Sequence, residues 1–354
     1  MVSPRKPGRT LVMAGAVVLS AAVILCGTAA GGSFIGFANP AVVWNLRLPR
    51  VILAFITGGA LAVSGAVFQS VLKNQLASPY ILGVSSGASL GAALVMAAGA
   101  AAGVTAVTRV TAVTGVTAAA GSLFRFGAAW LGSLTLPLAG FVFGVGTVFL
   151  VILLASRLDS SLSNNTIILF GMVFSLFINA ILTTMLALFR EELKNLLIWQ
   201  LGSFALRGWN SVWLMIPFLI TGMAGIIRYI KEMDILSFGE DEARSLGVDA
   251  RRVRTRLFLY AALLTGAAVA LSGVIGFVDL IAPHIARRIT GSNHRYVLPM
   301  SFFAGGILMV LSDLAARIII SPSELPVGAV TALIGAPFFA WIYFRRPAKR
   351  RSFR

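Results

Sequence analysis

Residues that usually build catalytic and metal sites are scarce in this sequence. The 354 residues include one cysteine, Cys26, and two histidines, His284 and His294. A single cysteine excludes a disulfide within the chain. No acidic cluster stands near the histidines, which argues against a metal centre or a proton relay. The G-x-x-x-x-G-K-[ST] motif is also missing, so we do not expect this chain to hydrolyse ATP by a P-loop mechanism.

Charged side chains are scarce as well. They make up 12% of the residues, whereas soluble domains contain about 25%. Apolar residues reach 58%, and the mean hydropathy is +0.91. A membrane-spanning helix needs about 20 apolar residues, and lipid cannot satisfy a free backbone polar group. The composition therefore predicts an all-α membrane protein, and the length leaves room for about ten spans.

The apolar runs predict a single transmembrane domain over residues 1–354. The first run lacks an A-x-A cleavage site, so we expect a retained helix in preference to the alternative, a signal peptide. The ten expected helices span about 11–31, 49–72, 79–99, 134–155, 166–189, 211–230, 255–275, 277–290, 298–320 and 327–344.

The basic residues indicate how the chain is oriented. A net charge of +17 is compatible with nucleic-acid binding, but the basic residues stand in short clusters at the ends of the apolar runs. That distribution follows the positive-inside rule and places both termini in the cytoplasm. We therefore expect a multi-pass protein of a bacterial or archaeal cytoplasmic membrane, with no nucleic-acid partner.

Two pairs of segments suggest an inverted internal repeat. AVSGAVF at 62–68 is similar to ALSGVIG at 270–276, and LPLAGF at 136–141 is similar to LPMSFF at 298–303. The pairing matches helices 2–5, about 49–189, with helices 7–10, about 255–344. An offset of five helices reverses the direction across the membrane, a plan that many transport proteins share.

One long stretch, at about 232–254, is polar and charged in an otherwise apolar chain. Six of the twelve acidic residues lie between Glu232 and Asp249. We expect a short cytoplasmic helix here, offered to a soluble partner. The alternative is a solvated linker. The low-complexity stretch Ala100–Ser122, on the outer side, is either a tolerated insertion or a contact for an outer partner.

The candidates for chemistry within the spans are few. GVSSG and GASLG (83–91) fit G-x-S-x-G, but they lie in a membrane helix, where small residues serve close packing. Asp313 precedes Arg317 by four residues, which suits a helical ion pair. Asp279 either lines a pathway or lies at the outer mouth. Arg47, Arg50 and Arg317 form a basic outer rim that is suited to an acidic partner.

These segments together resemble a known family. The stretch Asn45–Gly91, beginning NLRLPR, is similar to the first hallmark of the FecCD-type permeases. LSFGEDEARSLGV, SGVIGFVDLIAPHIARRI and ELPVGAVTALIGAPFFAWI follow in the family's order. The resemblance implies a type II ABC importer permease with ten helices. Its partners would be a second permease copy, two ATPase subunits that hold ATP and Mg, and an extracytoplasmic binding protein.

The resemblance also implies roles for individual residues. The segment that couples to the ATPase would contain Glu240, Asp241, Ala243, Arg244, Leu246 and Gly247. Arg47, Arg50 and Arg317 would dock the binding protein. Asn164 and Asn165 would form the cytoplasmic gate. Asp279 departs from the family, which commonly has glycine at this position, so its place in the pathway stays one of two alternatives.

The resulting prediction is an importer permease that carries an iron chelate, with an iron-siderophore preferred and haem or cobalamin as alternatives. We expect no enzyme activity, metal or cofactor in this chain. Two rivals stay open. An ion-coupled secondary transporter would need Asp279 or Asp313, and an intramembrane enzyme would need Ser85 and Ser89.

Overall fold

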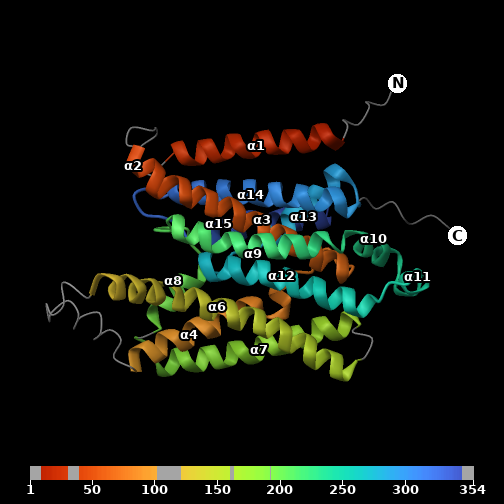
Figure 1. Ribbon diagram of the computed structural model, residues 1–354, viewed down its shortest axis with the longest axis horizontal. Helices are drawn as coiled ribbons and strands as arrows, with labels where there is room; N and C mark the ends of the chain where they lie inside the picture. The colour runs from red at the N-terminus through yellow and green to blue at the C-terminus, as the bar shows by residue number, and fades with distance from the viewer. Residues whose placement is uncertain (1–8, 31–39, 102–120, 160–162, 192, 345–354) are drawn as a thin grey trace.

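The computed structural model describes residues 9–30, 40–101, 121–159, 163–191 and 193–344. These residues form a bundle of helices that lie side by side (Figure 1). The elements in chain order are α1 (Arg9–Ala29), α2 (Pro40–Val42), η1 (Val43–Arg47), α3 (Leu48–Val71), η2 (Pro79–Leu82), α4 (Val84–Ala101), α6 (Gly121–Leu158), α7 (Asn164–Leu188), α8 (Lys194–Gln200), α9 (Trp209–Ile227), α10 (Ile230–Phe238), α11 (Glu240–Ser245), α12 (Ala250–Ser272), α13 (Val278–Thr290), α14 (His294–Ile318) and α15 (Val327–Phe344).

Each of the ten expected helices has a counterpart among the described residues, but several begin earlier than expected. Helix α12 starts at Ala250, where the Asp249 side chain accepts a hydrogen bond from the backbone N–H of Arg252. Helix α14 starts at His294, capped in the same way by Asn293. The shift arises because the first turns of both helices are polar, and a search for apolar runs passes over them.

Two breaks interrupt helices that the sequence led us to expect as continuous. The expected helix 79–99 is divided into η2 and α4 at Gly83, whose φ of 84° lies in the left-handed region. The expected helix 255–275 ends at Gly273, with a φ of 77°. The chain then runs without helix until α13. A left-handed glycine at each point ends the hydrogen-bonded ladder without the steric cost that a side chain would add.

Helix α8 was not predicted. It lies between the expected helices 166–189 and 211–230, where the sequence predicts only a connection. Leu193, just before the helix, and Leu196 within it are fully buried and pack with Ala92 and Ala93 of α4. At seven residues α8 is too short to give a clear periodic pattern.

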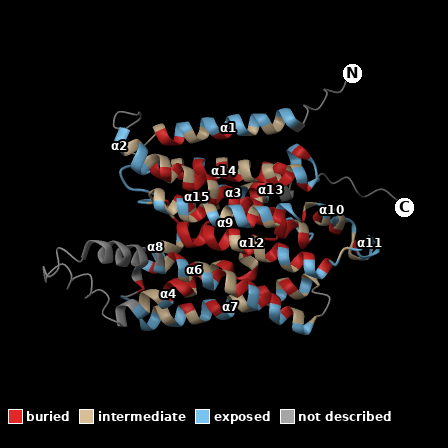
Figure 2. Cartoon of the chain, viewed as in Figure 1, coloured by how far each residue is buried: buried red, intermediate tan, exposed pale blue. Residues whose placement is uncertain are grey.

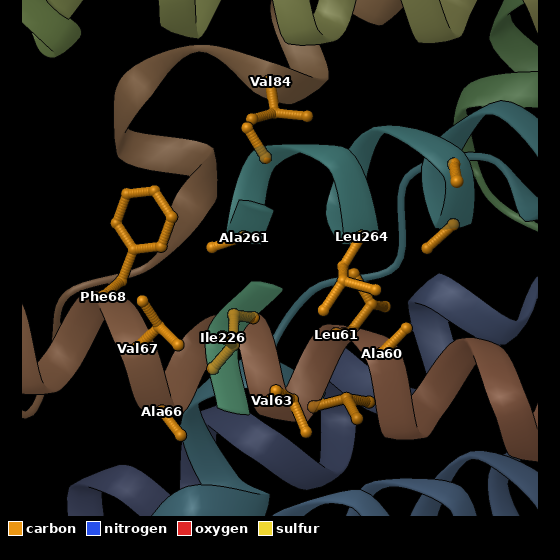
Figure 3. Packing of buried hydrophobic residues seen from close by; sticks show 14 of the residues in the cluster. Ala60, Leu61, Val63, Ala66, Val67, Phe68, Val84, Ile226, Ala261 and Leu264 are labelled. Carbon is orange, nitrogen blue, oxygen red and sulfur yellow. The ribbon is translucent and has the colours of Figure 1, made fainter. Parts of the chain in front are cut away.

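The packing core is centred on α3. Its most apolar window is 83% buried, against 17% for α1 and 22% for α7. Figure 2 shows the same contrast, with buried residues concentrated in the middle layers and exposed faces on α1 and α7. Leu61 of α3 lies beside Leu264 of α12 in the same cluster (Figure 3). Phe68 of α3 packs with Phe258 of α12, and the two ring centroids are 4.9 Å apart.

Glycines bring α3 and α14 into close contact. A Cβ atom at Gly58 would overlap the backbone of Gly305, and a Cβ at Gly305 would overlap that of Gly58. Without an apolar driving force between helices in lipid, such contacts provide the dispersion energy that holds helices together. This pair therefore fixes α14 against the central helix.

The lengths of the helices agree with a membrane protein. Among the described residues, seven helices are long and apolar enough to cross a bilayer, and two shorter apolar stretches, Val84–Ala98 and Val327–Trp341, belong to α4 and α15. Exposed apolar side chains such as Phe177, Ile220 and Leu333 cover the outer faces. The predicted fold class, an all-α membrane protein, is confirmed.

The packing partners support the predicted inverted repeat. Helix α4 packs on α6 as α13 packs on α14, and α6 packs on α12 as α14 packs on α3. The two first helices of the expected repeats, α3 and α12, pack on each other. These pairs are those expected if 49–189 and 255–344 share one plan, and the repeat stays a prediction.

Candidate functional site

The charged segment forms two short helices, α10 and α11, at one end of the bundle (Figure 1). Ala243 faces inward and is fully buried, whereas Asp241 and Arg244 are exposed. Two large apolar side chains are exposed on the same segment, Phe238 at 81% and Leu246 at 67%. Gly247 ends α11 with a φ of 77°. The segment therefore presents a mixed charged and apolar surface beyond the bundle.

An ion pair attaches α11 to α12. The Oε1 atom of Glu240 lies 2.6 Å from Nη2 of Arg254, whose side chain is only 2% exposed. In the sequence, Glu240 and Arg254 both lie in the polar stretch at about 232–254. The burial of Arg254 shows that this stretch is fastened to the membrane helices and does not behave as a solvated linker.

A second contact attaches α10 to α14. The Oδ1 atom of Asp234 accepts a hydrogen bond from the backbone N–H of His294, at 3.1 Å, and lies 2.5 Å from Nδ1 of the same residue. His294 opens α14 and its side chain is 6% exposed. The segment is thus held on two different membrane helices through two carboxylates.

Asp279 lies inside the bundle and not at an outer mouth. It is fully buried in the first turn of α13, and the hydroxyl of Ser78 donates a hydrogen bond to its Oδ2. Its backbone carbonyl accepts from Nε2 of Gln69, at 3.3 Å. Arg287 donates to Gln69 Oε1 and, at 3.2 Å, to the carbonyl of Ala66. This polar cluster joins α3, η2 and α13 in the interior.

The two residues expected to form the gate, Asn164 and Asn165, are the first two residues of α7. Asn164 donates through Nδ2 to the carbonyl of Leu72, 3.1 Å away, at the end of α3, and Asn165 is exposed. Asp159 Oδ2 accepts from the backbone N–H of Ser163 and from the Thr166 hydroxyl, both at 3.0 Å. These bonds fix the position at which α7 begins. Positions 160–162, just before these residues, lie outside the described residues.

At the opposite end of the bundle four charged residues form a cluster centred on Asp313. Arg50 donates to Asp313 at 2.8 Å and reaches both carboxylate oxygens of Glu324 at 2.9 Å. Arg317 lies 3.2 Å from the other Asp313 oxygen, which confirms the ion pair expected from their spacing. Asp313 is fully buried, and the side chains of Arg50 and Arg317 are 11% and 5% exposed.

The arginines of the expected outer rim are engaged within the chain. Arg317 also donates to the carbonyls of Gly27 and Ala30, at 3.0 and 2.9 Å, at the end of α1. Arg47 donates to the carbonyl of Ala29 at 3.1 Å and is partly exposed. Arg317 thus joins α1 to α14 in a buried position, which the expectation of a rim facing outward did not anticipate.

Glu324 is the exposed member of this cluster, with 38% of its side chain accessible. Its hydrogen bonds to Arg50 lower the pKa of this carboxyl below its usual value of 4.5. The pair therefore adds stability that is present above pH 4.5 and is lost as the pH falls through the lowered pKa.

Sequence inspection missed several partners at these sites, among them Ser78, Asp234, Arg254 and Glu324. Ser78 and Asp234 touch residues 201 and 60 positions away, and Arg254 touches Glu240 on a different helix, so no local spacing points to them. Glu324 carried a signal, because it lies in the quoted ELPVG motif, a short distance beyond Arg317. Only the packing of α14 against α3 shows that its partner is Arg50.

The fold and these sites define a membrane-embedded transport subunit that has no nucleotide-binding motif of its own. The chain belongs to the FecCD transport family, which it matches over residues 10–345. Members of this family are ABC transporter permeases, and the ATPase is a separate subunit.

Individual relatives agree with this assignment. The Fe(3+) dicitrate transport system permease protein FecD of Escherichia coli is 36% identical over 308 residues, which are 86% of this chain and 85% of the relative. The cobalamin import system permease protein BtuC of Halobacterium salinarum is 35% identical over 301 residues, 85% of this chain and 73% of the relative.

A solved structure shows the same fold. It is an inward-facing conformation of a protein assigned to the metal-chelate type of ABC transporter. The TM-score is 0.79 at 28% sequence identity, and the match covers 95% of this chain and 99% of the other.

Proposed function

We propose that this chain is the membrane-spanning subunit of an ATP-driven importer that moves an iron chelate, an iron-siderophore in the first instance, across the cytoplasmic membrane. One observation carries the proposal beyond family membership. The α10–α11 segment exposes Phe238 and Leu246 beside a run of charges while two buried residues fasten it to α12 and α14. A fastened segment with exposed apolar side chains has the properties of a partner-binding surface.

The partner at this end is the ATPase. In this proposal α11 enters a cleft of that subunit, where Asp241, Arg244 and Leu246 contact it and Glu240, Ala243 and Gly247 set the shape of the helix. Closure of the ATPase on ATP would then move α10 and α11. The Glu240–Arg254 ion pair would transmit the movement to α12, and the Asp234–His294 contact would transmit it to α14. The basic residues at the ends of the spans support a cytoplasmic position for this end and for both termini.

The partner at the opposite end is a substrate-binding protein. Arg47 is partly exposed, and Arg50 pairs with Glu324, whose side chain is 38% exposed. We infer that an acidic side chain of the binding protein takes the place of Glu324 on the Arg50 guanidinium, because the planar fork accepts one carboxylate as well as another. Arg317, which is buried, would support docking by holding Asp313 and the end of α1.

Two copies of the chain would enclose the pathway. Asn164 and Asn165 begin α7 at the α10–α11 end, where two such pairs meeting across a dimer axis would close the passage. Asp279 would shape the passage from within, since its cluster fixes α13 against α3. The absence of ion-coupling acids other than Asp279 and the paired Asp313 among the spans disfavours an ion-driven carrier.

The choice of cargo can be tested directly. We would purify the chain from native membranes with its partners, identify them by mass spectrometry, and record the absorbance spectrum of the binding protein. An ATPase together with a binding protein that carries a ferric chelate band supports the proposal. A haem or corrinoid spectrum would identify haem or cobalamin as the cargo in place of an iron-siderophore. Recovery of neither partner would contradict the proposal that the chain is part of an importer.

A further inference from the structure

A pocket of about 800 Å³ opens at the α10–α11 end of the bundle. The last turns of α9, the start of α10 and the first turns of α12 and α14 enclose it. Four cationic side chains line the pocket, and all four are exposed: Arg228, Lys231, Arg256 and Arg295. The roles proposed above for docking, coupling and gating use none of them.

These cations form no ion pair with an acidic side chain in the described part of the chain, although one carboxylate, that of Glu232, also lines the pocket. In the part of the chain that the structure describes, Arg228, Lys231 and Arg295 take part in no ion pair. Arg256 is held in place by Tyr229, since its Nη1 donates to the phenol oxygen at 2.6 Å and its guanidinium carbon lies 5.9 Å from the ring centroid. The pocket therefore contains concentrated positive charge with one guanidinium already oriented.

Part of the pocket lining is apolar and continues onto a face suited to lipid. Met223, Ile227, Leu298 and Pro299 form this part of the lining. Ile227 is 53% exposed and lies on the same helix as Ile220, which is 62% exposed. A molecule with an anionic head and long apolar chains would place its head among the cations and its chains along α9. Basic pockets between membrane helices have this property.

One acidic residue in the pocket limits the kind of headgroup that the pocket can bind. Glu232 lines the wall, and its Oε2 atom is buried and has no hydrogen-bond partner among the described residues. A headgroup that carries only negative charge would be repelled by this carboxylate, whereas a headgroup hydroxyl would donate to it once the Glu232 side chain turns toward the pocket. We propose that the pocket binds an anionic phospholipid with a hydroxylated headgroup, phosphatidylglycerol being the fitting case. Its phosphate would meet the arginines, and its glycerol hydroxyls would meet Glu232.

The test uses the full chain in nanodiscs and counts retained lipids by native mass spectrometry. The discs contain phosphatidylcholine with equal small amounts of phosphatidylglycerol, phosphatidic acid and phosphatidylethanolamine. We expect phosphatidylglycerol to be retained in preference. The double variant R228Q/R295Q should weaken its retention roughly 25-fold, from about fivefold for each basic residue near a membrane surface. The matched control R157Q/R288Q removes two exposed arginines outside the pocket and should leave retention unchanged.

A second variant tests the headgroup. E232Q removes the carboxylate charge, so we expect retention of phosphatidic acid to rise toward that of phosphatidylglycerol. Three results would overturn the proposal: equal loss in the pocket and control variants, equal retention of phosphatidylethanolamine and phosphatidylglycerol by the unmodified chain, or displacement of the lipid by soluble glycerol phosphate at matched concentration. If R228Q/R295Q loses ATPase binding but still retains the lipid, the pocket belongs to the ATPase interface, and the lipid site is likewise rejected.

Discussion

Replacing Asp313 should destabilise the bundle far more than replacing an exposed aspartate. Asp313 is fully buried between Arg50 and Arg317, at 2.8 and 3.2 Å. The substitution Asp313→Asn keeps the shape of the side chain but removes the only buried charge that faces both guanidinium groups in the described cluster. Breaking a buried pair costs about 3–5 kcal/mol. Arg50 keeps Glu324 and Arg317 keeps two carbonyls, so we expect the lower part of this range, about 3 kcal/mol.

The chain provides a matched control for this substitution. Asp249 pairs with Arg252 at 2.9 Å, but the two side chains are 51% and 78% exposed. Exposed pairs contribute about 0–1 kcal/mol, so Asp249→Asn should change the free energy of unfolding by no more than that. The measurement is unfolding of the purified chain by titration with sodium dodecyl sulfate, followed by circular dichroism. Equal changes for the two variants would refute the view that Asp313 holds the ends of α3 and α14 together.

Three further predictions concern function. Leu246→Asp should uncouple ATP hydrolysis from transport while the spans stay folded, because it places a charge where α11 exposes an apolar side chain. Normal transport in vesicles would contradict the proposal that α11 couples to the ATPase. Glu324→Gln should tighten docking of the binding protein, by about threefold to tenfold in Kd for one freed charged hydrogen-bond partner. Charge reversal at the partly exposed Arg47 should weaken docking most at low salt. Docking that is indifferent to Glu324→Gln would reject the exchange of carboxylates. Asp234→Asn should raise the ATP consumed per molecule transported, since α10 loses its charged contact with α14, and an unchanged ratio would show that the contact does not transmit movement.

The order and type of the membrane helices could be predicted from the sequence, because each span must be an uninterrupted apolar run in lipid. Dependence on apolar runs also explains where the predicted helix boundaries were wrong. Helices α12 and α14 begin with polar turns, and the break at Gly83 follows from a left-handed conformation that leaves the apolar pattern unchanged. Helix α8 contains too few residues for a periodic signal.

The candidate site divides in a similar way. The pair Asp313–Arg317 could be predicted because both residues lie on one helix, four positions apart. The contacts of Arg50 with Glu324 and of Glu240 with Arg254 depend on which helices pack together, and the sequence alone does not specify this. The position of Asp279 was left open between two alternatives, and the structure places it in the interior beside Ser78.

The two attachments of the α10–α11 segment have a mechanical consequence. Glu240 holds α11 on α12, and Asp234 holds α10 on α14, while α12 and α14 both pack against α3. A force applied to the segment from one direction is therefore divided between two helices in contact with the same central helix. If the force on α12 differs from the force on α14, the two helices would rotate about α3, and the bundle would not move as one rigid body. The direction in which a partner pulls would then decide which side of α3 moves first.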